Sequence, residues 1–326
     1  MAQEFVVFSG SANEGLADAI AAELGARLGS RAVARFPDGE TAVRLDVPVR
    51  GRDVVLIQPT APPVNDNVIE LLAFADACRR SAAARITAVV PYFGYARSDK
   101  RHARREPITA SLVARLMQTA GIDQVVTLDL HADQIEGFFS IPVDNLSAAP
   151  SLCRALGDQL PEGVVVVSPD AGRVKAASDY AQRLGAPVVV LHKRRDSPDA
   201  TAVTHVVGDV TDRPCLIIDD MISTGGTIAR AVEALLAAGA RREIIVAATH
   251  GLFVGDARGM LARAGVRRVV VTDSIAQSTS GPTPPEVVSI APLFAAAIRR
   301  IHQADSSLVD LYRDAPAAAR AVSSPV

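Results

Sequence analysis

The sequence predicts an α/β protein with parallel sheets, divided into two similar domains. The chain has 326 residues, and because single domains usually hold about 100 to 200 residues, this length favours two of them. Short β-branched runs alternate with segments of helical period, which is the order of βαβ units. Crossovers in such units are nearly always right-handed and cover both faces of the sheet, so the strands are expected to run parallel.

The second half of the chain repeats the plan of the first. In the first half, the expected strands and helices occupy residues 5–8, 16–24, 54–57, 68–77 and 86–90. In the second half, they occupy residues 164–167, 174–184, 188–191, 216–218, 227–238 and 244–248. Segments 54–94 and 215–253 agree in detail, because each contains a strand, a polar loop, an Ala/Leu-rich helix and a second strand. We infer an internal duplication.

The domain boundary is expected near residues 147–150. This gives an N-terminal domain at 1–146 and a C-terminal domain at 147–312. Beyond Tyr312 the periodic apolar pattern stops, and Ala, Ser and Pro dominate. Such a segment has nothing to anchor it to a core. Residues 313–326 are therefore expected to form a flexible tail.

The composition is that of a globular protein without a strong overall charge. Hydrophobic residues make up 49% of the chain and charged residues 21%, with a formal net charge of −2. These values argue against a disordered or nucleic-acid-coating protein, so any basic site must be local. The longest aliphatic stretches have strand length, far below the roughly 20 residues that span a bilayer. We expect neither nucleic acid nor a membrane as a partner.

The N-terminal residues predict a cytoplasmic location. Residues 1–4 lack the basic and apolar regions of a signal peptide.

The three cysteines, Cys78, Cys153 and Cys215, are far apart and lie in largely apolar surroundings. This spacing suggests neither a disulfide framework nor a zinc site. Buried free thiols are expected instead.

The strongest chemical signal lies at residues 216–227, which read Leu-Ile-Ile-Asp-Asp-Met-Ile-Ser-Thr-Gly-Gly-Thr. A buried strand is expected to end in Asp219 and Asp220, before a loop that opens a helix. Glycines let backbone N–H groups turn toward an anion, and the helix N-terminus adds positive potential. The two carboxylates would accept hydrogen bonds from ribose hydroxyls. The predicted sugar-phosphate cradle consists of Ser223, Thr224, Gly225, Gly226 and Thr227.

An ordinary βα turn with Thr as the N-cap is the alternative interpretation of this loop. Paired acids at the end of an apolar strand are costly unless something satisfies them, which favours a ligand. The loop resembles the motif that binds phosphoribosyl pyrophosphate (PRPP) in the phosphoribosyltransferase-type fold. That fold serves transferases, some regulators and the enzymes that make PRPP. The resemblance implies that both domains are of the phosphoribosyltransferase type.

A second segment distinguishes among these functions. Residues 129–144 read Asp-Leu-His-Ala-Asp-Gln-Ile-Glu-Gly-Phe-Phe-Ser-Ile-Pro-Val-Asp and resemble the signature of the ribose-phosphate pyrophosphokinases, or PRPP synthetases. The resemblance extends from Phe8 to about His302. It implies transfer of the β,γ-diphosphoryl group of ATP to the anomeric hydroxyl of ribose 5-phosphate, a step in nucleotide biosynthesis. It also implies a requirement for Mg²⁺ and a homo-oligomer built from dimers.

The same resemblance implies an ATP site on the N-terminal domain. Phe36 would stack on adenine, and Asp38 and Glu40 would accept hydrogen bonds from the exocyclic amine of the base. The alternative interpretation of this segment is a surface turn built on Pro-Asp-Gly. Arg97 matches the ATP-binding arginine of the family, within a basic stretch suited to a triphosphate. His131 matches the histidine that lies beside the ATP phosphates and helps to hold Mg²⁺. A lone histidine after a strand would otherwise be a structural hydrogen-bonding residue.

The remaining matches fall in the C-terminal domain. Asp170 follows the strand 164–167 and resembles the second Mg²⁺ ligand, although it could merely cap the next helix. Lys193 and Arg195 match the Lys-x-Arg pair of the mobile catalytic loop, for which a solvated basic turn is the alternative. In-line attack on the β-phosphorus builds charge on phosphoryl oxygens, and cations delivered at that moment stabilise it.

Two other functions would use some of these predicted binding and catalytic residues. A phosphoribosyltransferase needs the same cradle but no ATP segment, so residues 129–144 argue against it. A non-catalytic regulator would be expected to have lost its catalytic groups, yet Lys193, Arg195, His131 and Asp170 are all present. The sequence therefore favours a synthetase that binds ATP on its first domain and ribose 5-phosphate on its second.

Overall fold

We describe the fold from a computed structural model of the chain. It describes residues 5–101, 103–194, 203–278, 280–303, 307, 308 and 311, with the side chains of 193, 194, 203 and 204 left out. The chain folds into two compact units. Within the described residues, the first unit runs to Ser147 and also contains Asp273–Ala276 and Ser289–Leu311. The second contains Ala148–Thr272 and Gln277–Val288.

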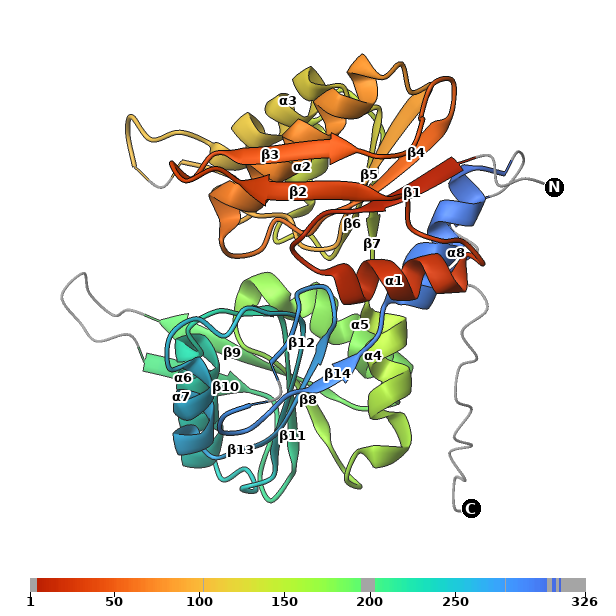
Figure 1. The fold of residues 1–326 in the computed structure, drawn as a ribbon. Coiled ribbons are helices and arrows are strands. Elements are labelled where there is room, and N and C mark those ends of the chain that lie inside the picture. The colour runs from red at the N-terminus through yellow and green to blue at the C-terminus, as the bar shows by residue number, and fades with distance from the viewer. Residues whose placement is uncertain are drawn as a thin grey trace. The chain divides into compact units, whose positions relative to one another are not determined.

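The first unit is built on a five-stranded parallel sheet with the strand order β1-β4-β5-β6-β7 (Figure 1). The strands of this sheet are β1 (Phe5–Ser9), β4 (Asp53–Ile57), β5 (Arg85–Val90), β6 (Gln124–Leu128) and β7 (Val143–Leu146). A separate antiparallel hairpin consists of β2 (Arg31–Arg35) and β3 (Thr41–Leu45). The helices are α1 (Glu14–Glu23), α2 (Val64–Arg80), α3 (Thr109–Ala120), the 3-10 helix η1 (Asp133–Phe138) and α8 (Ala291–Ile301).

The second unit is built on a seven-stranded sheet with the order β10-β9-β8-β11-β12-β13-β14. All its neighbours are parallel except β9 and β10. The strands are β8 (Val165–Ser168), β9 (Val188–Arg194), β10 (Val203–Val207), β11 (Cys215–Ile222), β12 (Ile244–Gly251), β13 (Val266–Thr272) and β14 (Glu286–Val288). The helices are α4 (Ala149–Leu156), η2 (Gly157–Gln159), η3 (Ala171–Arg173), α5 (Val174–Leu184), α6 (Gly226–Ala237) and α7 (Ala257–Ala264).

The two units share one topology. The order β1-β4-β5-β6-β7 in the first unit corresponds strand for strand to β8-β11-β12-β13-β14 in the second. In both units an antiparallel pair, β2 with β3 or β9 with β10, follows the first strand along the chain. The predicted α/β class with parallel sheets is confirmed, and the repeated order supports the inferred duplication.

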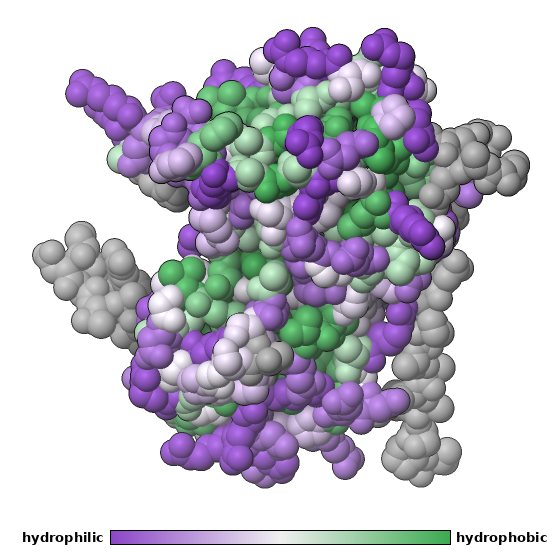
Figure 2. All heavy atoms as spheres, viewed as in Figure 1, coloured by the Kyte–Doolittle hydropathy of each residue, from purple (hydrophilic) through white to green (hydrophobic). Residues whose placement is uncertain are grey.

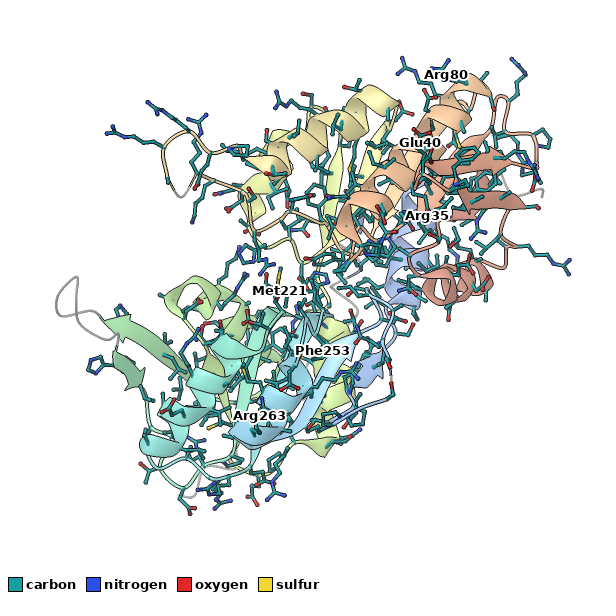
Figure 3. The ribbon with its side chains drawn as sticks, turned by 60° about the vertical axis from the view of Figure 1, so that its left-hand side comes forward. Arg35, Glu40, Arg80, Met221, Phe253 and Arg263 are labelled. Carbon is teal, nitrogen blue, oxygen red and sulfur yellow. The ribbon has the colours of Figure 1, made fainter. Side chains whose placement is uncertain are left out.

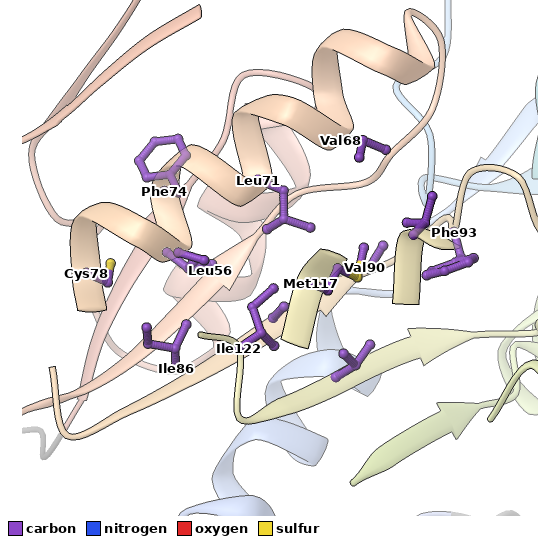
Figure 4. Packing of buried hydrophobic residues seen from close by; sticks show 14 of the residues in the cluster. Leu56, Val68, Leu71, Phe74, Cys78, Ile86, Val90, Phe93, Met117 and Ile122 are labelled. Atoms are coloured by element: carbon purple, nitrogen blue, oxygen red, sulfur yellow. The ribbon is translucent and has the colours of Figure 1, made fainter. Parts of the chain in front are cut away.

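Each unit buries its own hydrophobic core. In the first unit, helices α2 and α3 pack their apolar faces onto the sheet, and Leu71, Phe74 and Met117 are buried almost completely (Figure 4). In the second unit, α6 places Val232 and Leu235 in the same way against the central strands. These side chains repeat at the spacing of a helix face, which is why the periodic pattern located the helices.

The outer surface is mixed, and the cysteines lie beneath it. The face shown in Figure 2 carries mostly hydrophilic residues with smaller hydrophobic areas between them. No helix in the described part of the chain is both long and apolar enough to cross a membrane. All three cysteines are free and buried. Burial raises the pKa of Cys78 and of Cys153 to about 12 and that of Cys215 to about 11, so these thiols stay protonated at neutral pH.

Helix α8 differs from the expected domain division. It packs against α1 of the first unit and buries Phe294 and Ile298 completely. Just after it, the ring of His302 stacks on Phe5 with centroids 4.7 Å apart. The sequence predicts that all of 147–312 belongs to the C-terminal domain, whereas the chain returns to the first unit for α8. Contacts between residues this far apart in sequence leave no local signal.

The predicted tail at 313–326 lies outside the described residues.

Candidate functional site

Strand β11 carries the two predicted acids, and it is longer than expected. It comprises Cys215–Ile222, so Asp219 and Asp220 lie within the strand rather than at its end. On one side β11 pairs with β8 only as far as Ile217, whereas its pairing with β12 continues to the end of the strand. Because β8 ends at Ser168, the acids have a sheet neighbour on one side only. The segment that follows β8 can approach them from the other side.

Arg173 makes that approach, and sequence reasoning missed it. It is the last residue of η3, which follows β8. Its Nη2 lies 2.8 Å from Oδ2 of Asp220, and its Nε lies 3.5 Å from Oδ1 of Asp219. The three side chains are only 17%, 7% and 12% exposed, in that order. A signal was available, because two buried acids require a cation and Arg173 lies on the connection that leaves the neighbouring strand.

The environment of Asp219 disfavours its charged form. Burial raises the pKa of Asp219 well above its usual value, and the neighbouring carboxylate of Asp220 adds to the rise. The charge of Arg173 acts in the opposite direction, as does the backbone N–H of Asp220, which donates to Asp219 Oδ1 over 2.9 Å. Only an ionised carboxylate is purely a hydrogen-bond acceptor. Arg173 therefore supports the form of the pair that can accept hydroxyl protons.

The loop after β11 presents unpaired donors at the start of a helix. Helix α6 begins at Gly226, and no described residue accepts a hydrogen bond from the backbone N–H groups of 224–227. The hydroxyls of Ser223, Thr224 and Thr227 also lack a partner within the described part of the chain. Such donors at a helix N-terminus attract anions. The loop can therefore hold a phosphate group.

The segment that follows β12 holds this loop in shape. The N–H of Leu252 donates to Ile222 O over 3.0 Å, and the N–H of Val254 donates to Ser223 O over 2.9 Å. Figure 3 labels Met221, near the end of β11, and Phe253, in the segment that follows β12. The conformation of Gly225 is left-handed, with φ +81°, so this position favours glycine.

Asp170 follows β8 at the same edge of the sheet. Its Oδ1 accepts from the N–H of Gly172 over 2.9 Å, which makes it the N-cap of η3. The capping role considered as the alternative is therefore present. Its Oδ2 has no hydrogen-bond partner among the described residues, and one carboxylate oxygen is enough for a cation that keeps most of its waters. Across the described residues, no three His, Cys, Asp or Glu side chains form a metal-binding group.

The predicted catalytic loop begins inside a strand. Strand β9 comprises Val188–Arg194, and Lys193 pairs with Thr204 of β10 in an antiparallel ladder. The expectation that Lys193 lies in a loop is therefore wrong for its backbone, because the partner strand extends β9 beyond the apolar run that predicted it. Arg195 lies outside the described residues, as does the side chain of Lys193.

In the first unit, Phe36, Asp38 and Glu40 lie in the turn between β2 and β3. The N–H of Phe36 donates to Glu40 O over 2.9 Å, and Asp38 Oδ1 accepts from the N–H of Glu40 over 3.1 Å. The surface turn considered as the alternative is therefore what the backbone forms. The ring of Phe36 is 54% exposed, which leaves it available for stacking. Figure 3 labels Arg35 and Glu40 at either end of this turn.

Arg97 and His131 follow neighbouring parallel strands, β5 and β6, so both lie beyond the same edge of the sheet. Arg97 is exposed, and His131 is partly buried. Asp99, two residues after Arg97, is buried and accepts a hydrogen bond from Gln134 Nε2 over 2.5 Å. This bond joins the two segments that carry Arg97 and His131.

Two family models match the chain. One is described as the N-terminal domain of ribose phosphate pyrophosphokinase and matches residues 5–121. The other is described as the phosphoribosyl synthetase-associated domain and matches residues 195–313.

Individual proteins match over most of their length. A ribose-phosphate pyrophosphokinase of Clostridium tetani is 44% identical over 301 residues, which cover 91% of this chain and 94% of that protein. One of Rhodopirellula baltica is 46% identical over 320 residues, covering 96% and 99%. The crystal structure of phosphoribosylpyrophosphate synthetase from Mycobacterium smegmatis has a TM-score of 0.86 and 43% identity, and the match covers 92% of this chain and 99% of that one.

Proposed function

The chain belongs to the ribose-phosphate pyrophosphokinase family, and from this premise we propose which unit binds each substrate. As a member of the family, the protein is a transferase of nucleotide biosynthesis. It moves the β,γ-diphosphoryl group of ATP to the anomeric hydroxyl of ribose 5-phosphate and produces PRPP and AMP. We propose that the second unit binds ribose 5-phosphate and that the first binds ATP.

The contrast between the two equivalent loops carries this assignment. The loop after β11 offers a row of unpaired backbone and hydroxyl donors, as described above. The equivalent loop after β4 contains Pro59, Pro62 and Pro63, which have no N–H to offer an anion. Its Thr60 hydroxyl is already used, because it donates to Tyr92 O over 3.1 Å and accepts a bond from the backbone of Gly94. Only one of the two loops is suited to a sugar phosphate.

Within the second unit, two groups of residues divide the substrate between them. Asp219 and Asp220 accept hydrogen bonds from the ribose hydroxyls. The residues that surround the 5-phosphate are Ser223, Thr224, Gly225, Gly226 and Thr227. The helix N-terminus and free donors of the loop support this division.

Within the first unit, ATP is bound by its base and its phosphates. Phe36 stacks on adenine, and the carboxylates of Asp38 and Glu40 accept from its amino group. Arg97 and His131 contact the phosphates. The exposed ring of Phe36 and the bond that joins the segments of Arg97 and His131 support this arrangement.

The chemistry needs orientation and charge more than covalent help. The anomeric hydroxyl oxygen attacks the β-phosphorus in line and loses its proton to water, while the bond to the oxygen that bridges the α- and β-phosphorus breaks and AMP leaves with that oxygen. Lys193 and Arg195 neutralise the charge that gathers on the migrating group.

We propose Mg²⁺ as the metal, with His131 and Asp170 as its protein ligands. Bound Mg²⁺ neutralises phosphate charge and fixes the geometry of the polyphosphate. The free oxygen of Asp170 fits an ion that takes one or two protein ligands and keeps its waters. By family resemblance, we also propose a cytoplasmic homo-oligomer built from dimers.

The metal assignment predicts a shift in magnesium dependence. His131→Ala and Asp170→Ala should each raise the Mg²⁺ concentration for half-maximal activity severalfold, because one ligand is lost. Asp209→Ala is the matched control. Asp209 Oδ1 accepts a hydrogen bond from the N–H of Thr211 over 3.0 Å, as Asp170 does from Gly172, so this variant loses the same kind of local bond away from the proposed metal. Titration of activity with Mg²⁺ measures the shift. An unchanged titration in both ligand variants would remove these residues from the site.

The loop assignment predicts a selective effect of charge at position 223. Ser223→Asp places a carboxylate against the phosphate dianion, at a cost of about 1 kcal/mol, or roughly fivefold in KM for ribose 5-phosphate. The KM for ATP should not change. Ser178→Asp, on the exposed side of α5, adds the same charge away from the loop and is the control. Steady-state kinetics with each substrate varied in turn decide the matter; a selective rise in the KM for ATP would assign the loop to the other substrate.

A further inference from the structure

The ion pairs of Arg173 place a cation against both of the proposed ribose-binding acids. The guanidinium contacts Asp219 through Nε and Asp220 through Nη2, so two different nitrogens engage two consecutive carboxylates. A planar guanidinium can make such a two-point contact, whereas a lysine ammonium is a point charge on a flexible stem. The contact therefore orients the acids as well as neutralising them.

The contact leaves an oxygen for a ligand. Arg173 lies near Oδ1 of Asp219, which also accepts from the backbone of Asp220. Both of these contacts are made to Oδ1 rather than to Oδ2, and the side chain of Asp220 is the other neighbour of this carboxyl group. An oxygen held in this way on a largely buried side chain is suited to accept from a sugar hydroxyl, because the desolvation cost has already been met in the free protein.

The backbone of Arg173 is itself anchored. Its N–H donates to Asp170 O over 3.3 Å, and the side chain of Asp170 caps the same short helix. The position of the guanidinium is thus determined by the connection after β8, which is independent of the 223–227 loop.

We propose that Arg173 is a positioning residue for ribose 5-phosphate, which holds Asp219 and Asp220 ready to accept the ribose hydroxyls. The inference rests on the proposed binding of this substrate by the second unit. Arg173 acts through the two carboxylates and stays paired with them when the sugar binds. It is distinct from Lys193 and Arg195, which act on the migrating diphosphoryl group.

The test compares Arg173→Met and Arg173→Lys with a matched arginine. Arg268, on β13, is 16% exposed and pairs with Glu286 over 2.6 Å, and its register with Ile245 puts it near the start of β12, away from the loop. Arg268→Met therefore removes a comparable ion pair from the same unit. The measurements are the KM for each substrate, kcat, thermal stability, and calorimetric binding of ribose 5-phosphate without ATP.

Arg173→Met is expected to raise the KM and the dissociation constant for ribose 5-phosphate about tenfold, the effect of one charged hydrogen bond, with the KM for ATP unchanged. Arg173→Lys should recover part of this loss, and Arg268→Met should lower stability without changing either KM. If Arg173→Met folds poorly, the lysine variant still reports the effect.

Two outcomes would overturn the inference in different ways. If neither Arg173 variant weakens ribose 5-phosphate binding while Ser223→Asp does, Arg173 only stabilises the fold and the loop assignment stands. If the Arg173 variants and Ser223→Asp all change the KM for ATP instead, the proposed substrate assignment fails together with the inference.

Discussion

Alanine at Lys193 or Arg195 is expected to lower kcat about a hundredfold or more, with much smaller changes in the KM of either substrate. The reason is that both cations act on charge that is greatest in the transition state, and an interaction made only there affects kcat rather than ground-state binding. Steady-state assays of AMP and PRPP formation by mass spectrometry measure the loss.

The arginine between these two residues, Arg194, provides their control. Arg194→Ala removes the same charge from the same stretch, at the position that the Lys-x-Arg pattern leaves open. It should therefore retain most of the turnover. Near-normal kcat in the Lys193 or Arg195 variant would end that residue's assignment, and an equal loss in all three variants would indicate a general effect of local charge.

Alanine at Gly225 is expected to raise the KM for ribose 5-phosphate on the order of tenfold and to reduce the free energy of unfolding by about 1 kcal/mol. The backbone there has φ +81°, and an added Cβ would lie 3.2 Å from Ala257 O. The loop must shift to relieve the backbone strain and the close contact with Ala257 O. Its N–H donors then no longer converge on the phosphate.

Gly163 separates the backbone cost from the effect on the site. It has φ +74°, and an added Cβ there would meet nothing within 4 Å. Gly163→Ala should therefore lose similar stability in urea unfolding and keep a normal KM. If Gly225→Ala also kept a normal KM for ribose 5-phosphate, the loop would not be the phosphate cradle.

The elements that local patterns predicted are all present, because helix and strand periods are properties of short segments, although others, such as α3 and β6, were not predicted. The expected helix at 174–184 coincides with α5, and the expected strand at 86–90 lies within β5. The predicted ends of strands were wrong where pairing with a neighbouring strand determined how long the strand is. Strand β11 continues through Asp219 and Asp220 because β12 pairs with it, and β9 continues to Arg194 because β10 does. Polar and charged residues hide such extensions from a search for apolar runs.

Residues that are neighbours along the chain were enough to predict the α/β class, the internal repeat, the family and the loop at 216–227. Tertiary structure alone decided that α8 joins the first unit and that Arg173 reaches the two acids of β11. Both results depend on elements that meet only after the sheets have formed. Burial and ion pairing act between residues that are close in space, whereas periodicity and motifs depend on residues that are close in sequence.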